Sequence, residues 1–249
     1  MQELEPDVIS ILGIDVSTFA SYDEALAIIS RRIRLGIQTF CVAINPEKIY
    51  RAIRSAELHE SLRSAHLRIC DGIGICFASM LLHGRRIPRC TGIDLFIKLI
   101  HFAARENLNV FVLGASAETN EAGCRALRRT CPGLKIVGSH HGYFTNSADI
   151  VKGINDSEAD LLFVALGSPR QELWIFENLP KLRVRFCMGI GGSLDVVSGA
   201  VARAPMIFRA IGAEWLHRLL SQPSRLRRQA ALPVFAFDVL RAMTHLRRP

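Results

Sequence analysis

One aspartate is placed by its neighbours where it can accept a proton. Asp71 follows the short apolar run 67–70 and precedes Gly72 and Gly74, which leave room for a substrate. A hydroxyl group that attacks a donor must lose its proton, and a positioned carboxylate is a common base for that step. Asp71 also suits the N-cap of a following helix, so both roles stay open. We predict that Asp71 is a catalytic base.

A second polar residue, Asn45, also stands between an apolar run and the start of a helix. Asparagine is a favoured N-cap, and Pro46 suits the first helical position, so capping is one good interpretation. An asparagine at the carboxyl end of a strand can also hydrogen-bond a sugar or an acceptor. The two roles are compatible, and we group Asn45 with Asp71 as catalytic.

Two glycine-containing turns can bind a diphosphate. Residues 167–172 have the sequence Gly-Ser-Pro-Arg-Gln-Glu, which matches a capping box with Ser168 as the cap and Gln171 closing it. Such a turn also presents backbone N–H groups and the positive end of a helix dipole to a phosphate. The run 189–195 offers a second close approach of the backbone. The predicted donor-binding residues are Gly167, Ser168, Pro169, Gln171, Glu172, Gly191, Gly192 and Asp195.

The sequence gives little support for a metal or a cofactor. The nearest approach to an Asp-x-Asp motif, at residues 156–158, precedes its strand and suits a solvated helix end. The pair His140 and His141 has no evident partner acids and suits a surface loop. We therefore expect no metal and no cofactor, with arginine and helix N–H groups assisting the departure of a diphosphate. Neither glycine turn matches a dinucleotide fingerprint or a Walker loop.

The order of the elements predicts how these residues meet. Short apolar segments alternate with amphipathic helical patterns, which favours an α/β fold with a Rossmann-like, mostly parallel sheet and helices on both faces. Ligands of such sheets lie beyond the carboxyl ends of the strands. The expected helices cover residues 22–35, with Ser21 as the cap, and 91–107, and two more open at Pro46 and after Gly72. The expected strands are 11–16, 39–44, 67–70, 109–114, 134–137, 160–166 and 184–190.

The C-terminal part differs in charge from the rest. Nine arginines against Glu214 and Asp238 give residues 203–249 a charge of 9 − 2 = +7, out of +8 for the whole chain. Residues 205–221 have the pattern of one amphipathic helix, and the short apolar segment 230–240 suits a membrane surface. We expect a catalytic domain at 1–198 and a helical, arginine-rich, membrane-associating appendage at 199–249.

The rest of the composition bears on the compartment. The seven cysteines are odd in number, without C-x-x-C spacing, and suit buried positions in a reducing environment. No apolar stretch reaches the length of a membrane-spanning helix, and residues 1–5 lack the features of a signal peptide. We expect a cytoplasmic protein, peripheral on the inner face of the cytoplasmic membrane.

Taken together, these motifs resemble the WecG/TagA/CpsF glycosyltransferase family, from about residue 9 to residue 228. The resemblance rests on Asn45-Pro46-Glu47, Asp71-Gly72, Gly114, Gly138, Gly142-Tyr143-Phe144, residues 167–172, Gly191-Gly192, Asp195, Gly199, Arg203-Ala204-Pro205 and Glu214-Trp215. It implies an inverting, metal-independent enzyme that moves a sugar from a UDP donor to a polyprenyl-diphosphate-linked saccharide. Such a product belongs to exopolysaccharide or cell-surface polysaccharide biosynthesis.

The resemblance also implies roles for single residues. The aspartate matching Asp71 is the proposed base, and the donor binds near the Pro-x-Gln-Glu run. Appendage arginines of the family help to close the site and bind an anionic membrane surface. Arg218, Arg225 and Arg228 match them by position, and we expect Arg203 to share this role. One departure is Ala43, which stands where some members have a threonine.

Several points stay open at this stage. The donor sugar, the acceptor saccharide and the oligomeric state, a homo-oligomer included, are not determined. A Rossmann-type oxidoreductase is an alternative, although the phosphate fingerprint is missing. A basic nucleic-acid-binding protein is a weaker one, because the basic residues are not interleaved with stacking aromatics. We therefore expect no nucleic-acid partner.

Overall fold

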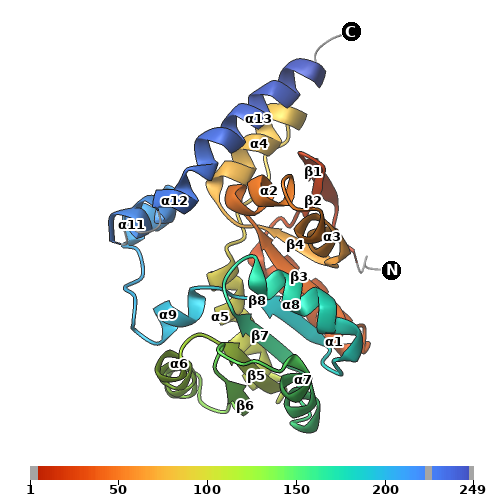
Figure 1. The fold of residues 1–249 in the computed structure, drawn as a ribbon, viewed down its shortest axis with the longest axis vertical. Coiled ribbons are helices and arrows are strands. Elements are labelled where there is room, and N and C mark those ends of the chain that lie inside the picture. The colour runs from red at the N-terminus through yellow and green to blue at the C-terminus, as the bar shows by residue number, and fades with distance from the viewer. Residues whose placement is uncertain (1–4, 222–225, 247–249) are drawn as a thin grey trace.

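A single eight-stranded sheet crosses the part of the molecule that the computed structural model describes, residues 5–221 and 226–246 (Figure 1). The strand order is β1-β2-β4-β3-β8-β7-β5-β6. Every neighbouring pair is parallel except β1 and β2. The predicted mostly parallel α/β sheet is therefore confirmed. The strands are β1 Val8–Ile11, β2 Ile14–Ser17, β3 Thr39–Ile44, β4 Leu67–Cys70, β5 Asn109–Gly114, β6 Lys135–His140, β7 Leu161–Ala165 and β8 Phe186–Gly189.

The first segment departs from the prediction. We expected one strand at residues 11–16, whereas the structure has the antiparallel pair β1 and β2. Leu12 and Gly13 connect them with φ values of +50° and +84°. Positive φ at both central residues is the geometry of a type I′ hairpin turn. Leucine is an unusual residue for this position, which is why the sequence did not indicate a turn.

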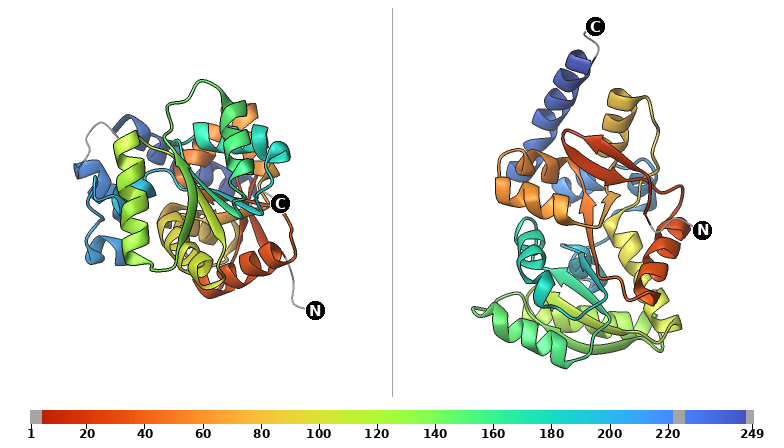
Figure 2. Two further views of the ribbon diagram at one scale, coloured as in Figure 1. Left: turned by 90° about the horizontal axis from the view of Figure 1, so that it is seen from below. Right: turned by 90° about the vertical axis from the view of Figure 1, so that its right-hand side faces the viewer.

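Helices cover both faces of the sheet (Figure 2). Their bounds up to residue 197 are α1 Tyr22–Arg34, α2 Pro46–Ala52, α3 Ala56–Ser64, α4 Ile73–His83, α5 Gly92–Arg105, α6 Ala117–Thr130, α7 Ser147–Asp156, α8 Arg170–Asn178, a 3₁₀ turn at Leu179–Lys181, and α9 Ser193–Val197. The side chains of β3 alternate between two hydrophobic cores. Phe40, Val42 and Ile44 join the core shared with α2, α3, α4, α7 and α8, while Cys41 and Ala43 join the core shared with α1, α5 and α6.

In the described residues, the chain then continues into four short or medium helices. These are α10 Met206–Ala210, α11 Glu214–Ser221, α12 Leu226–Gln229 and α13 Ala231–Leu246. The continuous helix expected at 205–221 is wrong, because the chain turns at Gly212 with φ +76° between α10 and α11. A Cβ atom at this position would lie 2.9 Å from the Cβ of Ile73. The close contact with α4 thus favours a glycine where a helix would otherwise continue.

The last helix, α13, packs against α2 and α4 at one end of the molecule (Figures 1 and 2). Phe235 and Val239 are buried in the same core as α2 and α4, and Ala231 is also buried. Part of the segment that we expected at a membrane surface is therefore part of the folded body. Among the described residues, no helix has both the length and the apolar character needed to cross a bilayer.

Candidate active site at the strand ends

A cavity of about 580 Å³ lies at the carboxyl ends of β3, β4 and β8. Its volume is in the usual range for small-molecule sites. Helix starts from α2, α4, α8 and α9 contribute to its wall, and α11 and α13 complete it. The predicted site residues that line it are Asn45, Asp71, Gly167, Ser168, Gln171, Gly191 and Gly192. Pro169, Glu172, Asp195 and Arg203 are not among its lining residues.

Asp71 lies directly after β4, half-buried in this cavity. Its backbone N–H donates to the carbonyl oxygen of Ile44 (2.8 Å), which continues the pairing of β4 with β3. The N-cap of α4 is Gly72, without a side-chain cap. Gly72, and not Asp71, is therefore the N-cap residue of α4, and the role of Asp71 as the base stays a prediction.

The start of α5 approaches the carboxylate of Asp71 closely. A Cβ atom on Gly92 would lie 3.8 Å from Oδ2 of Asp71 and 3.2 Å from the Cβ of Ala43. Ala43 also lines the cavity, so the methyl group stands beside the predicted base. This is the position at which the resembled family carries a threonine in some members.

Asn45 caps α2 and lines the cavity at the same time. Its Oδ1 accepts a hydrogen bond from the backbone N–H of Lys48 (2.9 Å), and Pro46 is the first helical residue. The predicted cap is confirmed. Because the cap holds the side chain at the cavity wall, Asn45 is also in position to contact a ligand.

A buried ion pair that the sequence did not indicate lies behind this wall. The Nζ of Lys48 is 2.8 Å from Oε1 of Glu172, and the two side chains are only 6% and 0% exposed. The Nζ also donates to the carbonyl oxygen of Ala43 (2.8 Å). Glu172 therefore links α8 to the β3–α2 turn. The prediction that Glu172 contacts the donor directly has no support from this arrangement.

The capping box predicted for residues 168–171 is wrong. Helix α8 begins at Arg170, Pro169 is its N-cap without a side-chain cap, and the Ser168–Pro169 peptide is cis. Gln171 points to the neighbouring loop, where its Oε1 accepts from the N–H of Gly191 (3.0 Å). Its Nε2 donates to Oε1 of Glu172 (2.8 Å).

Two features of this turn bear on ligand binding. The Oγ of Ser168 is buried without a hydrogen-bond partner among the described residues, although Ser168 lines the cavity. A Cβ atom on Gly189 would lie 2.5 Å from Nε2 of Gln171, so glycine at this position makes room for the amide. The glutamine thus holds the Gly191 turn in place, and the serine keeps an unused polar group at the cavity wall.

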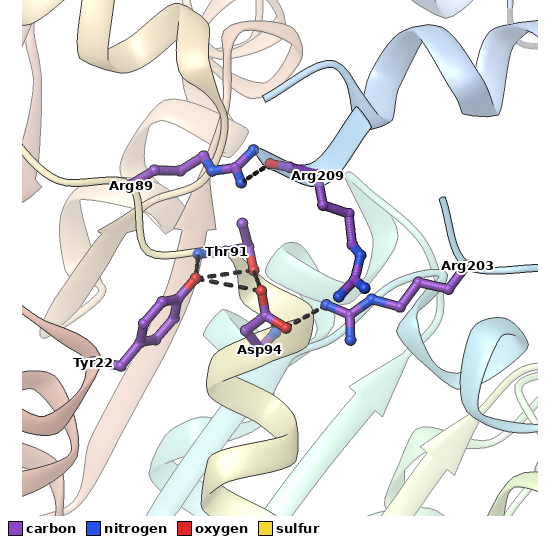
Figure 3. Close-up of polar contacts among 6 residues, drawn as sticks. All are labelled: Tyr22, Arg89, Thr91, Asp94, Arg203 and Arg209. Atoms are coloured by element: carbon purple, nitrogen blue, oxygen red, sulfur yellow. Dashed lines mark hydrogen bonds and ion pairs between the residues drawn. The ribbon is translucent and has the colours of Figure 1, made fainter. Parts of the chain in front are cut away.

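Charged residues gather at the start of α5, where the chain leads to the C-terminal helices (Figure 3). Arg203 forms an ion pair with Asp94 on α5. Asp94 also accepts from Oγ1 of Thr91 (2.7 Å), and the backbone N–H of Thr91 donates to the hydroxyl of Tyr22 (2.8 Å). Arg89, which lines the cavity, donates from Nη2 to the carbonyl oxygen of Arg209 (2.6 Å). Two side-chain contacts thus join the start of the C-terminal segment to the body.

The titration of these groups follows from their surroundings. Burial raises the pKa of Tyr22 to about 12, so its hydroxyl stays protonated at neutral pH. Burial also opposes ionisation of Asp94, but hydrogen bonds from Arg203 and Thr91 outweigh it and hold the pKa of this carboxyl below its usual value. Asp94 is therefore an anion when the protein is folded near neutral pH. Sequence reasoning missed Arg89 and Asp94, because neither stands in a motif.

Some predicted residues have other or undescribed places. Asp195 is half-buried on α9, and its carbonyl oxygen accepts from the N–H of Val201 (3.0 Å). Arg225 and the side chains of Arg218 and Arg228 lie outside the described residues. The arginine-rich, membrane-associating character of the appendage and the boundary at residue 198 therefore stay predictions.

Groups suited to metal binding are not evident in the described part of the chain, where no three His, Cys, Asp or Glu side chains come together. All seven cysteines are free thiols, and six of them are buried. Burial raises the pKa of Cys90 to about 12. The cysteines thus lie where the sequence placed them, among apolar side chains.

The chain is similar in sequence to known glycosyltransferases. The chain matches the model of the "Glycosyl transferase WecG/TagA/CpsF family" over residues 9–249. An N-acetylglucosaminyldiphosphoundecaprenol N-acetyl-beta-D-mannosaminyltransferase of Bacillus spizizenii is 35% identical over 202 residues, covering 81% of this chain and 79% of the relative. A Staphylococcus aureus protein of the same name is 33% identical over 210 residues, covering 84% and 82%.

Proposed function

Since this chain belongs to the WecG/TagA/CpsF family of glycosyltransferases, we propose that it moves a sugar from a UDP donor to a polyprenyl-diphosphate-linked saccharide with inversion at the anomeric carbon. The observation that carries the proposal is the position of Asp71, in one cavity with two glycine-rich turns at the strand ends. Family membership speaks against the oxidoreductase and nucleic-acid-binding alternatives.

The donor half of the site is formed by the β7–α8 and β8–α9 turns. Gly167 and Gly191 line the cavity with positive φ values of +77° and +48°, and Gly192 follows as the N-cap of α9. Glycine allows a phosphate to come close to such a backbone. The unpartnered hydroxyl of Ser168 in the same wall is suited to bind a donor oxygen, because a buried polar group gains most from a partner.

The reaction at the other half needs one base. The acceptor hydroxyl oxygen forms a bond to the anomeric carbon as the bond from that carbon to the diphosphate breaks. UDP leaves with the bonding electrons, and the hydroxyl proton passes to the carboxylate of Asp71. Asn45 supports the acceptor from the neighbouring strand end, and backbone N–H groups of the two glycine turns offset the charge of the departing diphosphate.

The names of the relatives suggest the first substrates to test. They describe transfer of N-acetylmannosamine to N-acetylglucosaminyl-diphosphoundecaprenol. We infer that UDP-N-acetylmannosamine and the corresponding lipid-linked N-acetylglucosamine are substrates of this chain. A panel of UDP-sugars, run with and without EDTA, measures both the donor preference and the expected independence of a metal ion.

The decisive variant is Asp71→Asn. Loss of a general base costs roughly 10²- to 10⁴-fold in rate, while the amide keeps the shape of the site, so binding of UDP measured by calorimetry should change little. Asp149→Asn, at an exposed aspartate on α7, is the matched control and should retain full activity. Full activity of the Asp71→Asn variant would refute the assignment of the base.

We further propose that the C-terminal segment binds an anionic membrane. The net charge of +7 on residues 203–249 supports this, since each basic residue near an anionic surface contributes about 1 kcal/mol. Co-sedimentation with vesicles should increase with the content of anionic lipid and decrease with added salt. Binding that changes neither with the content of anionic lipid nor with the salt concentration would contradict the proposal.

A further inference from the structure

The cavity continues from the strand ends into a wholly apolar groove between two helices. On α4 the lining residues with apolar side chains are Ile73, Phe77, Ala78 and Leu81. On α13 they are Leu232, Phe235, Ala236, Val239 and Leu240. Both sets recur at intervals of three and four residues, so each forms one stripe along its helix. We call the space between these two stripes the α4–α13 groove.

The groove exposes large apolar side chains. Phe77 is 62% exposed, Leu81 44% and Leu240 49%. Exposed apolar side chains are common singly, but a continuous set on two facing helices indicates a binding surface for an apolar ligand. The stripe on α4 runs from residue 73 to residue 81, about 12 Å along the helix axis at 1.5 Å per residue. This length accommodates a short piece of extended hydrocarbon chain.

The guanidinium of Arg89 lies where the polar and apolar parts of the cavity meet. A Cβ atom on Gly212 would lie 2.9 Å from the Cβ of Ile73 and 3.3 Å from Nη1 of Arg89. Ile73 is the first residue of α4, two positions after Asp71. The cavity therefore presents, in order, a carboxylate, a guanidinium and an apolar groove.

We propose that the α4–α13 groove binds the first isoprene units of the lipid-linked acceptor, with Arg89 facing its diphosphate. This inference rests on the proposed function. The acceptor carries a sugar hydroxyl, a diphosphate and a hydrocarbon chain in that order, which matches Asp71, Arg89 and the groove. A bilayer acyl chain or a second copy of this protein would match the groove alone. The continuity of the groove with the polar site favours the acceptor.

Two water-soluble acceptors distinguish the contribution of the groove to acceptor binding from that of the rest of the site. Both carry the same saccharide diphosphate, one esterified to a chain of two isoprene units and the other to a methyl group. In the absence of vesicles, the wild-type enzyme should show a lower KM for the prenylated acceptor. Phe77→Ser, on one wall, and Leu240→Ser, on the other, should raise this KM by about tenfold, the effect expected for losing much of one buried side chain. The KM for the methyl ester should stay unchanged.

Phe237→Ser is the matched control. Phe237 is 64% exposed on the same helix as Leu240 but does not line the cavity, so its replacement should leave both KM values unchanged. Equal KM values of the wild-type enzyme for the two esters would overturn the inference, as would groove variants that reduce vesicle binding without affecting the preference for the prenylated ester. Transfer to neither ester by the wild-type enzyme would instead contradict the proposed function.

Discussion

The β3–α2 turn and the β7–α8 turn have similar sequences and behave differently. Each places a polar side chain before a proline, at Asn45-Pro46 and Ser168-Pro169, and each predicts an N-cap. Asn45 caps α2 as expected, whereas Ser168 makes no cap and α8 begins at Arg170. In the second turn, Gln171 is bound by the adjacent Gly191 loop. The predicted cap therefore forms at Asn45, whose partner lies within its own turn. The predicted capping box does not form at Ser168, because Gln171, which would close the box, binds the neighbouring Gly191 loop instead.

The difference gives the two turns different roles. In the first turn, the side chain of Asn45 accepts a hydrogen bond from the N–H of Lys48, which fixes its position near the predicted base. The second leaves the hydroxyl of Ser168 at the cavity wall without a hydrogen-bond partner in the described part of the chain. Lys48 and Glu172 join the two turns through a buried ion pair. Four substitutions in or beside these turns, and a fifth away from them as a reference, test how far this division goes.

The largest effect is expected from Lys48→Met, which removes the link between the turns. Glu172 is fully buried and would lose its counter-charge, so the free energy of unfolding should fall by roughly 3–5 kcal/mol. Urea denaturation measures this loss. The double variant Lys48→Met/Glu172→Leu should recover much of it. A decrease in the free energy of unfolding below about 1 kcal/mol in the single variant would mean that the ion pair does not stabilise the contact between the two turns.

Gly189→Ala tests whether the position of the Gln171 side chain depends on the absence of a side chain at residue 189. The new Cβ would lie 2.5 Å from Nε2 of the glutamine, and overpacking of this kind costs about 1–3 kcal/mol. Affinity for UDP should fall with stability, because the Gly191 turn loses its support. The matched control is Gly153→Ala on α7, where a Cβ meets open space. The control should unfold at the same or a higher temperature than the wild type.

Asn45→Ala and Ser168→Ala compare the turns directly. Loss of a good N-cap costs about 1 kcal/mol of stability, so Asn45→Ala should lower the urea midpoint. Ser168→Ala should leave the midpoint unchanged or raise it, because the hydroxyl has no partner to lose. Its effect should appear in the KM for the UDP-sugar. A lower midpoint for Ser168→Ala would show that the hydroxyl is structural.

The smallest change in stability is expected from Asp94→Asn. Asp94 contacts neither turn, so this substitution serves as a reference for the substitutions in both turns. Its pKa is lowered in the folded protein, so its ion pair with Arg203 contributes stability above the ordinary aspartate pKa of about 4. This contribution is lost as the pH falls through the lower, folded-state pKa. Asp94→Asn should be less stable than the wild type at pH 7, and the two urea midpoints should converge in acid. A constant difference down to pH 3 would contradict the ion pair.

The sheet was largely predictable because its strands are short, buried and apolar. The bounds of β3, β4 and β5 coincide with the predicted ones, and the residues that follow β3 and β4 were recognised as cavity residues. Local patterns suffice for such elements, since a parallel strand that is buried on both faces is apolar throughout. The turn at Leu12 and Gly13 was missed because its residues are not typical of a hairpin.

The contacts that assemble the site were not predictable in the same way. Lys48 and Glu172 are 124 residues apart in the sequence, as 172 − 48 gives, and neither stands in a charge pattern. Arg89 and Asp94 become relevant only when the C-terminal segment lies beside α5. Pairings of this kind depend on tertiary packing, which hydrophobic periodicity and capping patterns do not contain.

The position of α13 also has a consequence for biosynthesis. All eight described strands precede it in the chain, so the sheet can form while this helix is still in the ribosomal exit tunnel. Until α13 emerges, α2 and α4 lack the cover that it provides, and their apolar surface is open to chaperones or to other nascent chains. Synthesis thus passes through a stage in which the sheet is folded while apolar surface of α2 and α4 is exposed, and that stage ends when α13 leaves the tunnel and packs against these helices.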